Sequence, residues 1–214
     1  MIPVKICGIM RPEDAALAVE LGAGLIGLLF WPESPRVVDR IRAREIVSSL
    51  PAGVDAVGVF VNQTEQAVEI AQHVGLRAIQ LHGDEQPASY RALVSTQNGL
   101  SVIKAVAVRD ESAVRRAREV PDGAKVLLDA HDAVKRGGTG RTIDWSLASA
   151  IARQRPVILS GGLNAGNVIE AIDAVHPVAI DVSSGVESSP GIKDPDKLRS
   201  LFDVLRHLAS GVRQ

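Results

Sequence analysis

The chain begins with the segment Val4-Lys5-Ile6-Cys7-Gly8-Ile9, a short apolar run that closes on a cysteine and a glycine. Seven further runs of this kind follow, each separated from the next by a stretch of helical periodicity. The runs are mostly apolar rather than alternating, which is typical of strands buried on both faces of a parallel sheet. The eight predicted strands are Val4–Cys7, Leu25–Phe30, Ala56–Val61, Ala78–Leu81, Val102–Val106, Lys125–Asp129, Val157–Ser160 and Ala179–Val182.

The stretches between the strands carry signals of helix starts. Pro12-Glu13-Asp14 opens the first helix, because acidic side chains are favourable near the positive end of a helix dipole. Asp194-Pro195-Asp196 opens the last helix in the same way. The third helix is expected to begin at Thr64 to Gln66 and the fifth near Asp110.

Eight strand–helix units in 214 residues predict an α/β fold, a single-domain (β/α)8 TIM barrel that spans residues 1–214. An open doubly wound sheet is the structural alternative. It rarely needs eight units in so short a chain, and no GxGxxG motif follows the first strand. The closed barrel is therefore the prediction.

Composition excludes several classes of protein. The net charge of −1 gives no reason to expect nucleic acid or a membrane surface as a partner. A single cysteine rules out internal disulfides and CxxC sites. No apolar run approaches the roughly 18 residues of a membrane span. Since the N-terminal residues also lack the regions of a signal peptide, a cytoplasmic protein is expected.

Residues suited to chemistry and binding follow the predicted strands. In a (β/α)8 barrel the C-terminal ends of the strands and the loops after them form the reactive face. The residues that fall there are Cys7-Gly8, Trp31 to Arg36, Asn62-Gln63, His82-Gly83-Asp84, Asp129, Gly161-Gly162 and Ser183-Ser184-Gly185.

The loops after the last two strands predict a phosphate site. Ser160-Gly161-Gly162 and Ser183-Ser184-Gly185 are turns of small residues, in which backbone N–H groups approach an anion closely. Barrels often bind phosphate at this place, although such glycines also serve simply to make tight turns. The loop from Ala130 to about Ile143 is glycine-rich and basic, and it either closes over a substrate or is a solvated loop.

Six motifs are spread over nearly the whole chain: Lys5-Ile6-Cys7-Gly8, Ser34-Pro35-Arg36, Gln80-Leu81-His82-Gly83, Leu128-Asp129 with Gly137-Gly138-Thr139-Gly140, Leu159-Ser160-Gly161-Gly162-Leu163, and Asp181-Val182-Ser183-Ser184-Gly185-Val186-Glu187. Together they resemble the phosphoribosylanthranilate isomerase family of tryptophan biosynthesis. The resemblance implies an Amadori rearrangement of N-(5-phosphoribosyl)anthranilate to 1-(2-carboxyphenylamino)-1-deoxyribulose 5-phosphate, with no cofactor and no metal.

The resemblance also implies roles for single residues. Cys7 is expected to be the general base and Asp129 the general acid, on opposite sides of the ribose. An ordinary thiol is only a few per cent ionised at neutral pH, so a lowered pKa of Cys7 would help, and helix N-termini at the barrel mouth could lower it. Burial or exclusion of water would have to favour the protonated form of Asp129.

Substrate binding is carried over to seven further residues. Arg36 is expected to hold the anthranilate carboxylate with its guanidinium fork. Asp181 is expected to orient the substrate amine or a loop, and His82 is either a structural histidine or a substrate contact. No chemistry is assigned to Lys5. The phosphate is expected on Gly161, Gly162, Ser184 and Gly185.

Other functions stay open at this point. The alternatives are a barrel of different specificity, such as indoleglycerol-phosphate synthase or the analogous isomerase of histidine synthesis, and a non-catalytic phosphosugar-binding barrel.

Phe30 and Trp31 are the rings placed to stack on the anthranilate. The expected partner is a small phosphosugar, with no nucleic acid or membrane, and the expected state is a monomer or a homodimer.

Overall fold

The computed structural model describes residues 1–95, 99–130 and 143–211. Eight parallel strands form a closed barrel in chain order. The strands are β1 (Val4–Cys7), β2 (Leu25–Leu29), β3 (Asp55–Phe60), β4 (Ala78–Leu81), β5 (Ser101–Val108), β6 (Ala124–Ala130), β7 (Val157–Leu159) and β8 (Ala179–Val182). The predicted (β/α)8 barrel is therefore confirmed, and all eight predicted strands are present.

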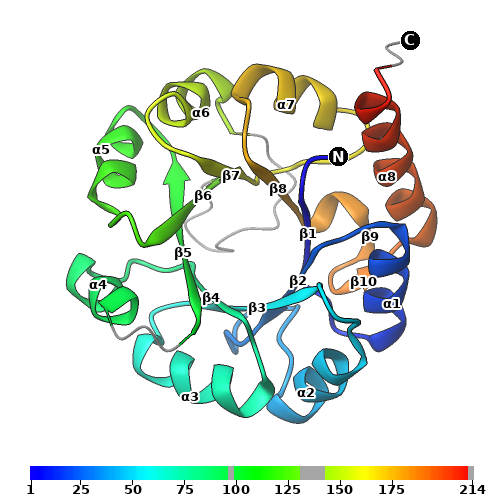
Figure 1. Cartoon of the computed structure of the whole chain (residues 1–214), viewed down its shortest axis with the longest axis horizontal. Helices are drawn as coiled ribbons and strands as arrows, with labels where there is room; N and C mark the ends of the chain where they lie inside the picture. The colour runs from blue at the N-terminus through cyan, green and yellow to red at the C-terminus, as the bar shows by residue number, and fades with distance from the viewer. Residues whose placement is uncertain (96–98, 131–142, 212–214) are drawn as a thin grey trace.

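A helix follows each strand, and the helices surround the barrel as a ring (Figure 1). They are α1 (Pro12–Leu21), α2 (Arg40–Ser49), α3 (Thr64–Val74), α4 (Pro87–Ser95), α5 (Ser112–Glu119), α6 (Trp145–Ala152), α7 (Val168–Val175) and α8 (Pro195–Ala209). The predicted helix starts at Pro12, Thr64 and Pro195 are confirmed. Asp194 caps α8, since its carboxylate accepts hydrogen bonds from the backbone N–H groups of Asp196 and Lys197.

The barrel closes between its first and last strands. Lys5 of β1 pairs with Leu25 of β2 on one side and with Asp181 of β8 on the other. Side chains alternate between the interior and the helix layer along each strand. Residues two apart on β1, such as Lys5 and Cys7, therefore face the same way.

Apolar side chains fill two separate regions. The larger core lies between the strands and the helices and includes Phe60 and Phe202, both fully buried. A smaller cluster within the barrel consists of Val57, Ala78, Ile103, Leu127, Ile158 and Ala179. Because this cluster fills the barrel interior, it is a packed floor beneath the mouth and not a pore.

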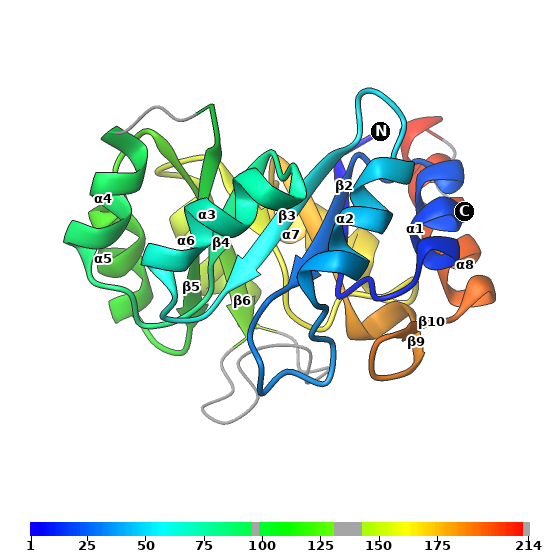
Figure 2. The ribbon, with the colours of Figure 1, turned by 90° about the horizontal axis from the view of Figure 1, so that it is seen from below.

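A short hairpin between β8 and α8 was not predicted. Strands β9 (Glu187–Ser189) and β10 (Ile192–Lys193) pair antiparallel. The turn contains Pro190 and Gly191, a pair of residues typical of turns. The hairpin lies at the end of the molecule to which the barrel strands point (Figure 2).

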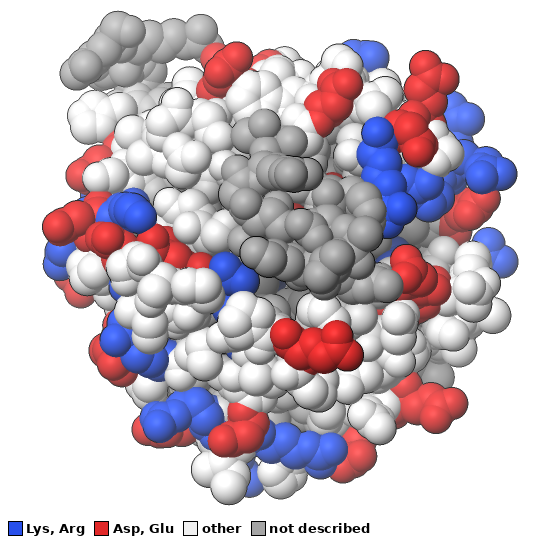
Figure 3. Space-filling view, turned by 180° about the vertical axis from the view of Figure 1, so that it is seen from behind, with Lys and Arg blue, Asp and Glu red and all other residues white. Residues whose placement is uncertain are grey.

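The visible part of that end carries charges of both signs, with Lys and Arg side chains interspersed among Asp and Glu (Figure 3). This distribution agrees with the net charge of −1. In the described part of the chain, no helix has the length and apolar character needed to cross a membrane.

Candidate active site

One cavity in the barrel mouth brings together the predicted acid and base. Its lining includes Cys7 from the end of β1 and Asp129 from β6. Arg36, His82 and Asp181 line the same cavity. Cys7 and Asp129 are 7% and 5% exposed, so both groups sit at the edge of a largely water-excluded space. Five predicted site residues thus converge, although they are drawn from across the chain.

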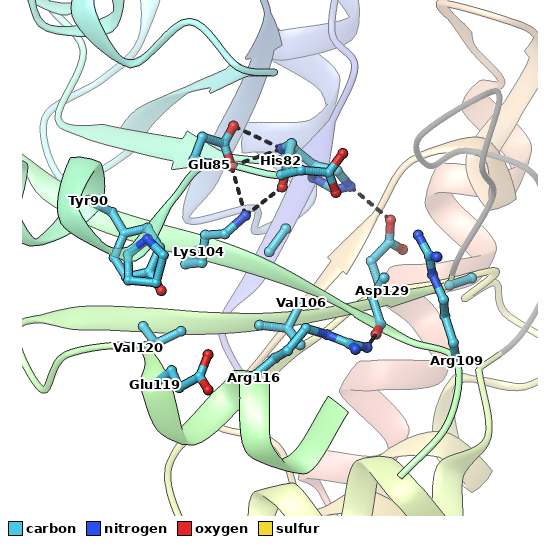
Figure 4. A pocket seen from close by; sticks show the side chains of 16 residues that line it. His82, Glu85, Tyr90, Lys104, Val106, Arg109, Arg116, Glu119, Val120 and Asp129 are labelled. Carbon is cyan, nitrogen blue, oxygen red and sulfur yellow. Dashed lines mark hydrogen bonds and ion pairs between the residues drawn. The ribbon is translucent and has the colours of Figure 1, made fainter. Parts of the chain in front are cut away.

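Asp129 is held by a chain of two part-buried contacts, of which Figure 4 shows the one with His82. His82 Nε2 lies 3.0 Å from Asp129 Oδ2, and Gln80 Nε2 lies 2.9 Å from His82 Nδ1. The amide nitrogen of Gln80 is a donor, so Nδ1 accepts and the ring hydrogen sits on Nε2, which donates to the carboxylate. His82 contacts Asp129 and also lines the cavity, so its place is compatible with both predicted roles, a structural histidine and a substrate contact.

Arg36 is buried in a two-point ion pair. Its Nε donates to Glu187 Oε1 over 2.9 Å, and its Nη2 donates to Glu187 Oε2 over 2.7 Å. Among the described residues nothing accepts a hydrogen bond from Nη1, which leaves that end of the fork for a ligand. Arg36 is therefore not an exposed surface charge.

Lys193 connects this ion pair to the first strand. Its fully buried ammonium donates to Glu187 Oε1 at 2.9 Å, to the Cys7 carbonyl at 2.6 Å and to the Ser183 carbonyl at 3.2 Å. Burial would raise the pKa of Glu187, but the hydrogen bonds and charges of Arg36 and Lys193 outweigh it and lower that pKa. Burial also lowers the pKa of Lys193 despite the neighbouring carboxylate.

The charge environment of Cys7 differs from the expectation. Burial raises the pKa of the Cys7 thiol, and the nearby Asp181 carboxylate adds to the increase. The positive charges of Lys5 and Lys193 oppose it. Desolvation of the thiolate is the largest effect, so the pKa of Cys7 lies above that of an ordinary thiol and the lowering that would help a base is not seen without substrate.

The loops after β7 and β8 offer free backbone donors. In the described part of the chain, the N–H groups of Gly161, Gly162, Ser184 and Gly185 donate no hydrogen bond. Gly161 and Gly162 have φ of +93° and +66°, a conformation that favours glycine. A Cβ on Gly185 would lie 1.9 Å from the Leu163 carbonyl oxygen, so the two loops touch only because residue 185 has no side chain.

The two candidate stacking rings have different positions. Trp31 lines the cavity, whereas Phe30 is buried and stacks on Phe60 with ring centroids 5.1 Å apart. Only Trp31 is thus placed to contact a bound ring. The basic loop predicted between Ala130 and Ile143 has its residues 131–142 outside the described part of the chain.

A larger cavity of about 490 Å³ lies beside the site, between β5 and helices α4 and α5 (Figure 4). Lys104 crosses it to Glu85, with Nζ 2.7 Å from Oε2, and also donates to the Gly83 carbonyl. These bonds fix the loop that follows His82. The sequence analysis did not predict this cavity.

Comparisons with known proteins agree with this geometry. The family model for N-(5'-phosphoribosyl)anthranilate (PRA) isomerase matches residues 4–204. The chain belongs to this family. An N-(5'-phosphoribosyl)anthranilate isomerase from Nitrosomonas eutropha is 47% identical over 207 residues, which cover 96% of this chain and 97% of the relative.

Solved structures of phosphoribosylanthranilate isomerases are also similar. One, in complex with reduced 1-(o-carboxyphenylamino)-1-deoxyribulose 5-phosphate, has a TM-score of 0.85 and 41% identity, covering 96% of this chain and 99% of its own. A structure of monomers generated from the dimeric enzyme of Thermotoga maritima gives the same TM-score, identity and coverage.

Sequence reasoning missed the supporting residues of this isomerase-family site. Glu187, Lys193 and Gln80 have no expected role there, although each contacts a predicted site residue. Glu187 closes the last of the six motifs, so its position in that motif was an available signal. Nothing in the sequence near Lys193 indicates that its ammonium reaches the carbonyl of Cys7.

Proposed function

We propose that this protein catalyses the Amadori rearrangement of N-(5-phosphoribosyl)anthranilate, an aldose–ketose isomerisation in tryptophan biosynthesis. The observation that carries the proposal is the shared cavity of Cys7 and Asp129, at the mouth of a barrel from the phosphoribosylanthranilate isomerase family. A buried thiol and a buried carboxyl group facing one space are the two groups that this reaction needs.

The first step opens the ribose ring. The protonated carboxyl group of Asp129 donates its proton to the ring oxygen while the bond between that oxygen and C1 breaks. The lone pair of the anthranilate nitrogen forms the C1–nitrogen double bond, which gives an iminium ion. His82 assists by holding one carboxyl oxygen of Asp129, so that the other oxygen faces the sugar.

The second step removes a proton from C2. The thiolate of Cys7 forms an S–H bond with the C2 hydrogen, and the electron pair of the broken C–H bond forms a C1–C2 double bond and neutralises the iminium. The Asp129 carboxylate then takes the C2 hydroxyl proton while the Cys7 thiol gives its proton to C1, which yields the ketone and returns both groups to their starting forms. Every proton is accounted for by one acid and one base.

The remaining residues bind the substrate in this proposal. The Nη1 group of Arg36 faces the anthranilate carboxylate, while Glu187 fixes the plane of the guanidinium. The free N–H groups of Gly161, Gly162, Ser184 and Gly185 bind the phosphate. Asp181 faces the substrate with Oδ2, the oxygen that Lys5 leaves free.

The proposal extends to partners and location. The ligand is a small phosphosugar, and the protein is a monomer or a homodimer. The steps above use only side chains of this chain. A cytoplasmic location fits the single unpaired thiol, which stays reduced in that compartment.

An assay with substrate made in situ tests the proposal. Phosphoribosylanthranilate is generated from anthranilate, the protein is added, and the loss of substrate is followed by fluorescence. Turnover by the wild type is expected to fall by about 100-fold or more in both Cys7→Ala and Asp129→Asn. Binding of the phosphosugar without turnover by the wild type would favour the non-catalytic barrel instead.

A further inference from the structure

The ammonium of Lys5 is buried close to the Cys7 thiol. Both residues belong to β1 and project to the same side, towards the barrel interior. Lys5 is only 1% exposed, and its Nζ donates to Asp181 Oδ1 at 2.9 Å across the β1–β8 seam. A fully buried lysine normally requires such a partner, because an isolated buried charge is very costly.

Gly27 lets the two groups approach each other. A Cβ on Gly27 would lie 2.7 Å from Cys7 Sγ and 3.0 Å from Lys5 Nζ. Both atoms therefore converge on one point above the bare backbone of β2. An ammonium has three N–H groups and the Asp181 carboxylate accepts from one of them, so further donors are available at this point.

The charged groups around the thiol have opposite effects on its pKa. Burial alone would lower the pKa of Lys5, but Asp181 and Cys7 outweigh it, and the pKa is raised, so Lys5 stays charged. Of the groups that lower the pKa of Cys7, Lys5 contributes most, by charge and by hydrogen bonding. Asp181 acts in the opposite direction.

Other charged groups face Cys7 from the remaining elements. Lys193 of β10 holds the Cys7 carbonyl, but its charge is shared with Glu187. Arg36, His82 and Asp129 line the same cavity further round the mouth, and each has a partner of its own. Lys5 is thus a cation that Asp181 holds in place and that converges with the sulfur on Gly27.

We infer that Lys5 is a positioning residue: its buried ammonium, held in place by Asp181, is the counter-charge that stabilises the thiolate form of Cys7. The inference rests on the proposed function, since it explains how a desolvated thiol serves as a base. Asp181 then acts through Lys5 and fixes the ammonium. No contact between Lys5 and the substrate is required.

Titration of the thiol tests this without substrate. Cys7 is the chain's only cysteine, so the ultraviolet absorbance of thiolate, with Cys7→Ser as the blank, reports this group alone. The double variant Lys5→Met/Asp181→Asn removes both charges and leaves no unpaired ion. Its titration midpoint is expected above that of the wild type, because Lys5 outweighs Asp181 at the thiol. The rise should be smaller than the about 1–3 units that removal of a single opposite charge gives, since the loss of Asp181 acts the other way.

Two further variants make the result specific. Lys5→Met alone removes the ammonium and keeps the opposing carboxylate, so it is expected to raise the midpoint further than the double variant does, whereas Lys5→Arg keeps the charge and is expected to restore most of the wild-type value. A merely structural role would not place the variants in this order. Lys104→Met, which removes another buried and ion-paired lysine, is expected to leave the midpoint unchanged.

The outcomes separate this inference from the proposed function. An unchanged or lower midpoint in Lys5→Met/Asp181→Asn would overturn the inference, even if the wild type turns over substrate. A raised midpoint supports it, and the pH at which kcat/KM reaches half its maximum should rise by the same amount. If the wild type shows no turnover, the isomerase proposal fails while the titration still decides the role of Lys5.

Discussion

The Arg36 guanidinium and the Glu187 carboxylate meet edge to edge, with Nε–Oε1 and Nη2–Oε2 distances of 2.9 Å and 2.7 Å. The pair joins residues 151 positions apart in the chain. Two parallel hydrogen bonds fix the plane of the guanidinium as well as its position. The donor that would receive the anthranilate carboxylate is therefore preset before substrate binds.

Replacing Glu187 should impair binding more than chemistry. In Glu187→Gln the guanidinium loses its fixed plane, and two buried cations, Arg36 and Lys193, lose their anionic partner. We expect KM to rise about tenfold or more with a smaller change in kcat, and the free energy of unfolding to fall by about 3–5 kcal/mol. Steady-state kinetics and urea denaturation measure the two effects. Glu45→Gln, which breaks an exposed pair with Arg42, should change neither.

The Glu187 carboxylate also predicts how the free energy of unfolding depends on pH. The folded pKa of Glu187 is lowered, so its ionised form stabilises the fold above the unfolded pKa of about 4.3. That contribution is lost as the pH falls through the folded pKa. The free energy of unfolding of the wild type should therefore decline more steeply below about pH 5 than that of Glu187→Gln. Parallel slopes for the two proteins would contradict this account of Glu187.

Gly185→Ala should disturb the phosphate loops. The added methyl group would meet the Leu163 carbonyl oxygen at 1.9 Å, and a backbone atom has no room to withdraw without moving its loop. We expect KM for the phosphorylated substrate to rise about tenfold or more, measured with inorganic phosphate as a competing ligand. Gly24→Ala is the matched control, because nothing lies within 4 Å of its added Cβ. Equal KM values for the two variants would argue against a phosphate site at these loops.

His82→Ala should lower kcat with little effect on KM. The variant removes the donor 3.0 Å from Asp129 Oδ2, so the carboxyl group would lose its fixed orientation towards the sugar. We expect kcat to fall by about tenfold to a hundredfold, which is less than the loss in Asp129→Asn. His73→Ala on the exposed face of α3 should keep the wild-type kcat. A large rise in KM with an unchanged kcat would instead indicate that His82 contacts the substrate.

The strands were predictable because each is itself a short apolar run in the sequence. All eight apolar runs form strands, and their limits differ from the prediction by at most two residues. The largest difference is β5, which runs to Val108 where the prediction ended at Val106. Its last two residues pair with Asp129 and Ala130 of β6, and this pairing depends on the neighbouring strand rather than on the composition of β5 itself.

The site was predictable only in part, for a similar reason. Cys7 and Asp129 stand at strand ends and Arg36 stands in the loop after β2, where the fold alone directs attention. The residues that hold these side chains in place do not stand at such positions. Glu187 and Lys193 are charged residues in a short polar hairpin, and their burial follows from contacts with segments more than 150 positions away. Periodicity and composition of a local segment carry no information about such contacts.

The residues that support Cys7 at the contact between β1 and β8 are synthesised long after Cys7 itself. Cys7 is synthesised 186 residues before Lys193, whose ammonium donates to the Cys7 carbonyl. Asp181, which anchors Lys5, also comes late. A nascent chain therefore has neither of these two supports for its thiol until Asp181 and Lys193 have been added.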